Sequence, residues 1–378
     1  MLRDTGQYEK ITRGGKIPFS FYTFTPRPLV GNDFYVIDDE LSSLLINAHR
    51  ELGILEGAVR HLPDCEAIRN IMVARECYFS RQLDYREDND FSAFQKAHSL
   101  GRIDASSIQN IISAFEFSLN ETVHNISLSK ICSIALYGHK SSQSIKEREK
   151  AIFLGRFVSN LKEYNPIAPE RILPAIADIT AFLQNNDKID VLIRVALAQY
   201  QFEMIHPYEC YNGIVGRIMI PMILRAYGGI KAASFIGVSE YLYFCKNDYF
   251  EILHSTQYSG GYIALIKFFV RAVYESAKNV NTRIEHILQI FTDDEKRISA
   301  ANTSNKVLPM VFDYFKSCVY SQVRMVSNDL GISFNTATKL INILCKLNIL
   351  QLENLQSRHR VFVYNRLLES LSEGVITE

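Results

Sequence analysis

One histidine, one asparagine–glycine pair and one arginine lie close together along the chain, and their residue types can do chemistry. His206 follows an apolar segment of helical spacing, residues 192–205, and Asn212 and Gly213 lie in the short polar loop after it. Arg217 falls in the first turns of a second apolar helix. A helix N-terminus offers main-chain N–H groups to an anion, and a histidine beside it can accept a proton. The spacing therefore predicts a site that holds an anion next to a base.

Each of these residues also has a structural interpretation. A histidine at a helix end is more often fixed by a main-chain carbonyl than used as a base, and Asn-Gly by itself is an ordinary turn. Pro207, directly after His206, ends the first helix. Arg217 lies four residues after Gly213, about one helical turn, and so points back toward the loop. Because these groups converge on one loop, the combination favours the functional interpretation.

Composition and charge are those of an ordinary globular chain of 378 residues, long enough for two or three domains. Hydrophobic residues make up 47% and charged residues 22%, which excludes a disordered or fibrous protein. Lysine plus arginine equals aspartate plus glutamate at 41 each, so the net charge gives no indication of nucleic-acid binding.

The seven cysteines are scattered without C-x-x-C spacing, which favours free thiols in a reducing compartment over a disulfide framework or a zinc site. The N-terminal residues lack the apolar core of a signal peptide, and no apolar run approaches transmembrane length. We therefore expect a cytoplasmic protein that has no membrane contact.

Helical periodicity dominates most of the chain, so the expected fold class is mainly α. Residues 1–40 are rich in aromatics, Pro and Gly and predict an irregular arm packed over a larger body. Amphipathic helices are predicted at 41–55 and 67–83, and further helical segments follow as far as residue 290. The charged stretch 291–305 predicts a linker.

Residues 145–170 differ from the helical segments around them. Their short apolar runs end at Gly155, Pro166 and Pro169, a pattern that fits a β-hairpin and equally a plain loop between helices. Both interpretations stay open from the pattern alone.

The last segment, 306–378, begins a new pattern. A helix, a short helix ending at Gly331, the helix 335–347 and two strands around a charged turn resemble a winged helix-turn-helix. Such domains bind DNA in some proteins and contact proteins in others, and both alternatives stay open. For DNA, the candidate contacts are Asn335, Thr336, Thr338 and Lys339 on the recognition helix and Arg358, His359 and Arg360 in the wing.

The stretch 205–224 resembles the signature of the Fic (filamentation induced by cAMP) family, H-P-F-x-D/E-G-N-G-R-x-x-R. The positions that match in register are His206, Pro207, Tyr208 (for Phe), Asn212, Gly213 and Arg217. The resemblance implies a protein adenylyltransferase in which His206 takes the proton from a Ser, Thr or Tyr hydroxyl of a target protein. That hydroxyl then attacks the α-phosphorus of ATP and leaves AMP on the target. ATP with Mg²⁺ is the implied cofactor.

The same resemblance implies where the nucleotide and the target would bind. The downstream segment KNDYFEIL is similar to the family's N-R-x-x-Y-Y. The implied nucleotide- and phosphate-binding residues are Asn212, Gly213, Gly216, Arg217 and Tyr249. Ile152, Phe153 and Leu154 fall where the family has its flap, a β-hairpin that docks the target's backbone.

Three positions of the loop depart from the family signature. Cys210 stands where Asp or Glu ligates Mg²⁺, and a soft thiol matches that hard ion poorly, so no metal ligand is assigned. Tyr211 replaces a glycine, and Ile214 replaces an arginine that would neutralise phosphate charge. These departures predict weak or altered transfer. They also leave a second hypothesis, a catalytically inactive Fic protein that binds DNA or protein as a regulator.

A helix upstream of the signature carries a further parallel. Many Fic proteins have an inhibitory helix with the motif S/T-x-x-x-E-G/N, whose glutamate pairs with the second arginine of the signature. Ser80 and Asp84 fit that spacing, and Tyr85 takes the Gly/Asn position. Because aspartate is one methylene shorter than glutamate, we expect the pair between Asp84 and Arg217 to be weak or absent.

The resemblance spans most of the chain and implies four parts. Residues 1–94 form the arm and a helical Fic-associated region, 95–290 the Fic core, 291–305 the linker and 306–378 the winged helix-turn-helix. This arrangement is known for bacterial Fic proteins with N-terminal autoinhibition. The implied partner is a protein target with a hydroxyl side chain, with DNA as an alternative for the last part. The oligomeric state stays open, a homodimer being one option.

Overall fold

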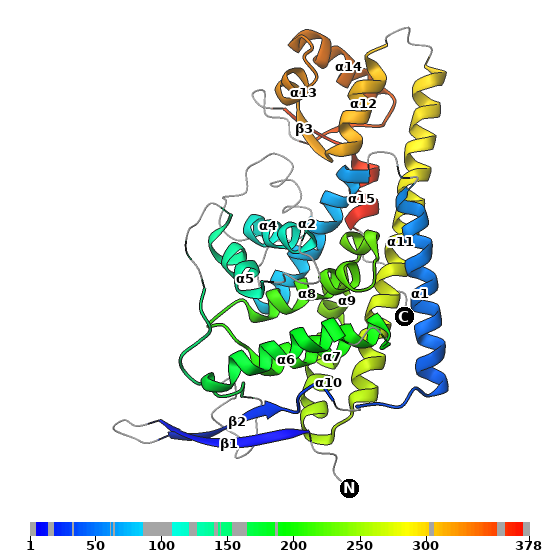
Figure 1. Cartoon of the computed structure of the whole chain (residues 1–378). Coiled ribbons are helices and arrows are strands. Elements are labelled where there is room, and N and C mark those ends of the chain that lie inside the picture. The colour runs from blue at the N-terminus through cyan, green and yellow to red at the C-terminus, as the bar shows by residue number, and fades with distance from the viewer. Residues whose placement is uncertain are drawn as a thin grey trace.

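The computed structural model describes residues 5–13, 19–31, 34–60, 62, 65–85, 108–120, 127–139, 143, 145–152, 165–185, 188–301, 306–353 and 360–372. Over these residues helices dominate and strands are few, so the mainly α fold class is confirmed (Figure 1). None of the described helices is long and apolar enough to cross a membrane.

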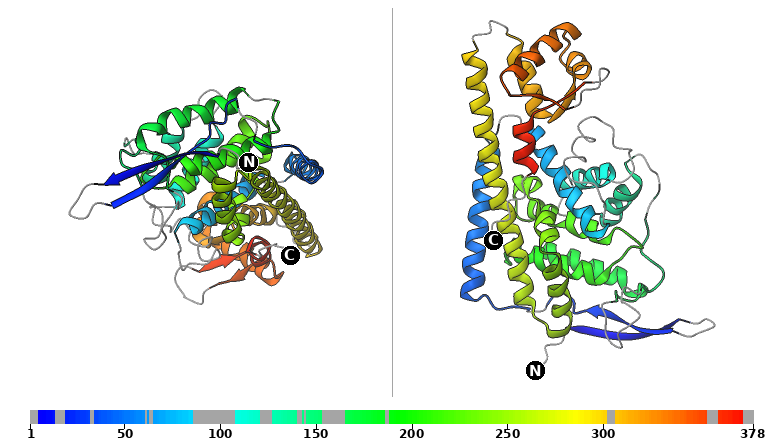
Figure 2. Two further views of the ribbon diagram at one scale, coloured as in Figure 1. Left: turned by 90° about the horizontal axis from the view of Figure 1, so that it is seen from below. Right: turned by 180° about the vertical axis from the view of Figure 1, so that it is seen from behind.

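Two long helices, α1 (Asp39–Arg60) and α11 (Tyr262–Ala300), lie side by side along one side of the molecule (Figures 1 and 2). The apolar residues of α1 recur at helical spacing and form a buried stripe. Asn281 of α11 donates from its amide to the main-chain carbonyl and to the carboxylate of Glu51 in α1, both at 3.0 Å. The two helices pack along their length, and α11 also contacts helices in the body of the protein.

The central helix is α7 (Val191–Ile205), in which every residue is buried. A helix that is apolar on nearly all sides is stable only in the interior of a protein. It packs against α6 (Ile172–Asn185), α8 (Asn212–Ala226) and α11. The C-terminal end of α7 is therefore fixed by the helices packed around it.

The remaining helices of the body surround α8 and its neighbours. In chain order they are α2 (Cys65–Asp84), α4 (Ile108–Leu119), α5 (Leu128–Tyr137), α9 (Val238–Phe244) and α10 (Lys246–Ser259), with short 3₁₀ turns η1 (Pro169–Arg171) and η2 (Lys231–Phe235). α2, α4 and α5 all contact α8, so the helix that follows the signature loop is enclosed by the segments upstream of it.

An antiparallel hairpin occupies the segment that the sequence predicted as an irregular arm. It consists of β1 (Gly6–Arg13) and β2 (Phe19–Pro26) and lies at the lower end of Figure 1. The N–H of Phe24 donates to the carbonyl of Asn165 at 3.0 Å, and the Asn165 amide donates to the carbonyl of Tyr22 at 2.9 Å. The aromatic residues therefore belong to a strand that is hydrogen-bonded to the body.

The C-terminal elements gather at the opposite end of the molecule (Figure 2). In chain order they are α12 (Leu308–Ser317), β3 (Tyr320–Gln322), α13 (Val323–Asp329), α14 (Phe334–Lys346), β4 (Gln351–Leu352), β5 (Val361–Val363) and α15 (Asn365–Ser372). The three strands form an antiparallel sheet in the order β3-β5-β4. The identification as a winged helix-turn-helix stays a prediction. The proposed wing residues Arg358 and His359 lie outside the described residues.

Most of the stretch predicted as a linker is helical, because α11 continues as far as Ala300. Its residue Asp294 looks like a solvated charge in the sequence but is fully buried. The Asp294 carboxylate accepts from the Tyr364 hydroxyl at 2.7 Å and from Nη1 of Arg366 at 2.6 Å. Both partners come from the last elements of the chain, so local composition could not reveal them.

Candidate active site

His206 follows the last turn of α7 in a left-handed backbone conformation, with φ at 49°. Its N–H donates to the carbonyl of Phe202 at 2.9 Å, and its Nδ1 is buried. Burial lowers the pKa of the His206 imidazole to about 4, against the opposing effect of a hydrogen bond to the main chain of Glu203. The side chain is 21% exposed and lines a cavity. The ring is therefore neutral near pH 7, and Nε2 is the nitrogen that can meet a substrate.

Arg148 fixes the end of α7. Its Nε donates to the main-chain carbonyl of His206 at 2.8 Å. Its Nη2 donates to the carbonyls of Ile205, at 3.2 Å, and Ile167. In addition, the N–H of Arg148 donates to the carbonyl of Pro207 at 2.8 Å. The last carbonyls of a helix lack partners within the helix and attract a cation. The buried guanidinium thus holds the unusual backbone of His206, a role that the sequence pattern did not reveal.

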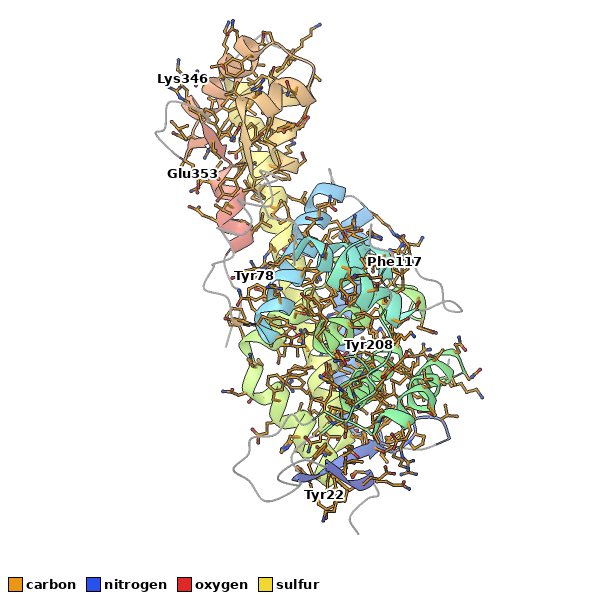
Figure 3. The ribbon with its side chains drawn as sticks, turned by 90° about the vertical axis from the view of Figure 1, so that its left-hand side faces the viewer. Tyr22, Tyr78, Phe117, Tyr208, Lys346 and Glu353 are labelled. Carbon is orange, nitrogen blue, oxygen red and sulfur yellow. The ribbon has the colours of Figure 1, made fainter. Side chains whose placement is uncertain are left out.

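Asn212 closes the loop between α7 and α8. Its Oδ1 accepts from the N–H of Tyr208 and its Nδ2 donates to the carbonyl of the same residue, both at 2.8 Å. Tyr208 itself is buried in the body of helices (Figure 3). The Asn212 side chain, which the sequence predicted to bind a phosphate, is therefore hydrogen-bonded to the main chain of the loop. What this turn can offer an anion is the main-chain N–H groups at the start of α8.

Tyr211 precedes α8 with φ at 64°, in the left-handed region that suits a glycine. This is one of the three positions at which the sequence departs from the resembled signature, and the loop keeps a glycine-like conformation with a tyrosine in it. The ring of Tyr211 lies 5.8 Å from that of Tyr85, centroid to centroid. Since a side chain disfavours this backbone by about 1–2 kcal/mol, the loop is strained at Tyr211.

Arg217 and α2 meet across the start of α8. Nη2 of Arg217 lies 2.9 Å from Oδ2 of Asp84 and donates to the carbonyl of Ser80 at 2.7 Å, while Nε donates to the Ser80 hydroxyl at 2.9 Å. Burial is the largest effect on the Arg217 guanidinium and lowers its pKa, but Asp84, Tyr249 and Glu203 together outweigh burial, so the pKa is raised. The expectation of a weak or absent pair is not met: the shorter aspartate reaches the arginine.

Two glycines of α8 provide room for these contacts. A Cβ added to Gly213 would lie 2.7 Å from Nη1 of Arg217 and 2.8 Å from Oδ1 of Asp84. A Cβ on Gly216 would lie 3.0 Å from Oε1 of Glu203, on the facing helix α7. Gly213 therefore permits the ion pair, and Gly216 permits the close packing of α7 on α8.

Glu203 and Tyr249 form a polar contact inside the cavity wall. The Tyr249 hydroxyl donates to Oε1 of Glu203 at 3.3 Å, and Oε2 of Glu203 lies 4.0 Å from Nδ1 of His206. Burial raises the pKa of the Glu203 carboxyl to about 7, partly offset by the charge of Arg217. Glu203 is absent from the residues expected from the sequence because it lies within an apolar helix. Its position three residues before His206, on the same helical face, was the available signal.

A cavity of about 830 Å³ unites these groups. This volume is in the range of small-molecule sites. The wall residues expected from the sequence are Asp84, His206, Cys210, Asn212, Gly213, Arg217 and Tyr249. The unexpected ones include Leu83, Tyr85, Glu203, Met204, Glu209, Phe250, Glu251, Leu253 and His254. Gly216 and Ser80 do not line it, and Ile214 is fully buried elsewhere in the core.

The donor set of this cavity does not fit Mg²⁺, which prefers several oxygen ligands in octahedral geometry. Cys210 lines the wall, and burial raises the pKa of its thiol, so that it stays neutral near pH 7. Among the described residues, no group of three or more His, Cys, Asp or Glu side chains is placed to hold a metal ion.

The remaining predicted residues lie away from the cavity. Ile152 lies in no helix or strand, and the other two flap candidates, Phe153 and Leu154, lie outside the described residues. In the C-terminal part, Asn335 and Lys339 line a separate groove of about 410 Å³ on α14, with Thr338, Asn342, Ile343 and Lys346. Thr336 instead takes part in the cap of α14 through Ser333, and Arg360 is exposed before β5.

Comparisons with known proteins find similarity over the part of the chain that contains this site. Residues 123–224 match the model of the Fic/DOC family, a range that contains His206, the loop and Arg217. The chain is 28% identical over 85 residues to protein adenylyltransferase fic-1 of Caenorhabditis briggsae, and 28% over 83 residues to that of Caenorhabditis elegans. These matches cover 22% and 21% of this chain and 15% of each relative, so only a small part of those proteins is compared.

In overall fold, the chain is similar to the crystal structure of a Fic family protein from Desulfovibrio desulfuricans G20. The TM-score is 0.53 at 15% sequence identity, over 88% of this chain and 98% of that one. At this identity the likeness concerns the fold alone.

Proposed function

Since residues 123–224 match the Fic/DOC family, we propose that the chain transfers AMP from ATP to a hydroxyl side chain of a target protein. The observation that carries the proposal is the position of His206. Its Nδ1 is buried and its ring lines a cavity of about 830 Å³ that also contains the start of α8. A base therefore lies beside an anion-binding helix N-terminus in a space of suitable size.

In the proposed reaction, Nε2 of His206 accepts the proton of the target hydroxyl. The oxygen attacks the α-phosphorus, the bond from the α-phosphorus to the β-phosphate oxygen breaks, and pyrophosphate leaves. The N–H groups at the start of α8 bind phosphate oxygens, and Arg217 binds the terminal phosphate after it separates from Asp84. No protein-bound metal is assigned a step, since the described donor set does not fit Mg²⁺.

Three features support weak or altered transfer. The low pKa of His206 keeps the ring unprotonated but also makes it a weaker base. Cys210 and Ile214 lack the charges that the family signature has at those positions. Arg217, which would bind the terminal phosphate, is already paired with Asp84 and hydrogen-bonded to Ser80. The alternative, a Fic protein without transfer activity, rests on the same three features.

Labelled ATP tests the two alternatives. The purified chain is incubated with ATP carrying a labelled α-phosphate, Mg²⁺ or Mn²⁺ and a mixture of cell proteins, beside the variants His206→Ala and Asp84→Gly. We expect label on protein with Asp84→Gly, less with the wild type and none with His206→Ala. If neither the wild type nor Asp84→Gly transfers label or binds ATP, the enzyme proposal fails. Cys210→Asp then shows whether an added carboxylate restores metal-dependent transfer.

A second function, binding of DNA, is supported by α14. One face of this helix packs inward through Ala337, Leu340, Ile341 and Leu344. The opposite face is exposed and carries Asn335, Lys339, Asn342 and Lys346. Lys346 lies at the far end of the molecule from the hairpin (Figure 3). A cationic, hydrogen-bonding helix face of this kind suits the major groove.

The charge balance near α14 also supports this second function. From Val323 to Lys346 the chain carries Arg324, Lys339 and Lys346 against one carboxylate, Asp329, which accepts from the Tyr314 hydroxyl at 2.7 Å. Lys339→Ala should weaken duplex binding and lower its salt dependence, whereas Lys296→Ala, on α11 with 73% of its side chain exposed, should change neither. Equal affinity of both variants, or no salt-sensitive binding by the wild type, would refute this function.

A further inference from the structure

Glu203 is a buried carboxyl that the proposed reaction does not yet use. It belongs to the last turn of α7 and is 7% exposed. Its Oε1 accepts from the Tyr249 hydroxyl at 3.3 Å and from Nε2 of Gln199 at 3.2 Å. Its Oε2 lies 4.0 Å from Nδ1 of His206. The carboxyl is thus held from α10 and α7 and directed at the buried side of the imidazole.

The close packing of α8 on α7 leaves space for the Glu203 carboxyl at Gly216. A Cβ on Gly216 would lie 3.0 Å both from Oε1 of Glu203 and from Nε2 of Gln199. The absence of a side chain at Gly216 therefore leaves the space in which Glu203 and its donor meet. Burying a carboxyl is costly unless hydrogen bonds compensate for the lost water, and here two donors do so.

Three charged side chains near the His206 ring affect how readily it takes a proton: Arg148, Asp84 and Glu203. Arg148, on the main-chain side, disfavours a protonated ring, and burial does so as well. Asp84 favours the protonated ring, but it is already paired with Arg217 at 2.9 Å. The charge of Arg217 lowers the pKa of Glu203, and the charge of Asp84 raises it. When the ring takes a proton, Glu203 is the carboxyl within 4.0 Å of it in the described part of the chain.

We propose that Glu203 is a positioning residue that acts through His206: its carboxylate, 4.0 Å from Nδ1, stabilises the protonated ring that forms during transfer. The part that concerns transfer rests on the proposed function, whereas the effect on the ring does not. Burial raises the pKa of Glu203 to about 7, so its negative charge develops as the pH rises through neutrality. The electrostatic support for His206 should therefore be absent at pH 6 and present at pH 8.

Nuclear magnetic resonance of the full chain, selectively labelled with ¹⁵N in its nine histidines, tests the effect on the ring. His206→Gln identifies the signals of His206. In the wild type, we expect these signals to move with a midpoint near pH 7 as Glu203 ionises. In Glu203→Gln, which keeps the size and an acceptor oxygen, this movement should disappear. Asp248→Asn removes an exposed carboxylate beside Tyr249 and should leave the movement unchanged.

Tyr249→Phe is a second, milder variant. It removes the hydroxyl that stabilises the ionised carboxyl, so the midpoint should shift to higher pH. If the wild-type signals do not move near pH 7, or still move in Glu203→Gln, the proposal on Glu203 is wrong. If they behave as expected but no AMP transfer occurs, only the proposed function fails. Where transfer occurs, Glu203→Gln should lower kcat by about tenfold or more with KM nearly unchanged.

Discussion

Asp84, the last residue of α2, forms an ion pair with Arg217 of α8, with 2.9 Å between Oδ2 and Nη2. The pair forms despite the short aspartate because Gly213 has no side chain between them, and a Cβ there would lie 2.8 Å from Oδ1 of Asp84. Lys246 of α10 also donates to the carbonyl of Leu83 at 2.7 Å, which fixes the end of α2. The helix is thus held over the cavity by its terminal carboxylate and its terminal carbonyl.

Removal of this carboxylate should strengthen nucleotide binding. In Asp84→Asn, Arg217 loses its charged partner but keeps both contacts with Ser80, so a terminal phosphate no longer competes with a carboxylate. We expect the Kd for ATP, measured by isothermal titration calorimetry, to fall by about tenfold. Ser80→Ala, which removes only a neutral acceptor, should have a smaller effect. An unchanged Kd in Asp84→Asn would show that the pair does not oppose the nucleotide.

Gly213→Ala should destabilise the protein by about 2 kcal/mol, because the added methyl group overlaps the buried ion pair. The matched control is Gly53→Ala in α1, where a Cβ meets nothing within 4 Å. That control should stabilise the protein by about 1 kcal/mol through helix propensity. Chemical unfolding of the two variants gives the comparison. Equal effects would mean that α2 moves away from Gly213 at little cost.

The strain at Tyr211 can be measured with two substitutions. Both Tyr211→Gly and Tyr211→Ala remove the ring that lies near Tyr85, but only glycine adopts a φ of 64° without cost. The glycine variant should therefore be more stable than the alanine variant by about 1 kcal/mol in the same unfolding experiment. A more stable alanine variant would indicate that the loop relaxes to another conformation once the ring is absent.

The contact between α1 and the start of α7 should depend on pH. Nε2 of His49 lies 2.7 Å from Oδ2 of Asp190, whose Oδ1 caps α7 by accepting from the N–H of Leu192. The hydrogen bond with Asp190 raises the pKa of His49 above 6.5. Since the folded value is raised, this stability is present below pH 6.5 and is lost as the pH rises through the folded pKa. The difference in Tm between the wild type and His49→Gln should accordingly be larger at pH 6 than at pH 8.5.

Short-range sequence patterns determine much of the site's local geometry. The apolar run before His206, the position of Pro207 and the interval from Gly213 to Arg217 all act within a few residues, where helix period and chain stiffness decide the geometry. The same holds for α14, whose alternation of buried and exposed positions follows from its period of 3.6 residues. For these elements, the neighbours in sequence are also the neighbours in space.

Other features depend on partners far along the chain. The charge on Asp294 indicates a linker in the sequence, but Tyr364 and Arg366 bind its carboxylate in the folded protein. The role of Arg148 likewise follows from its reach to the end of α7. The resemblance to the Fic family suggested Asp84 as a partner of Arg217, but the packing of α2 on α8 decided whether the shorter side chain reaches it. A buried charge is stable only with its partners, and tertiary structure alone brings partners together from distant segments.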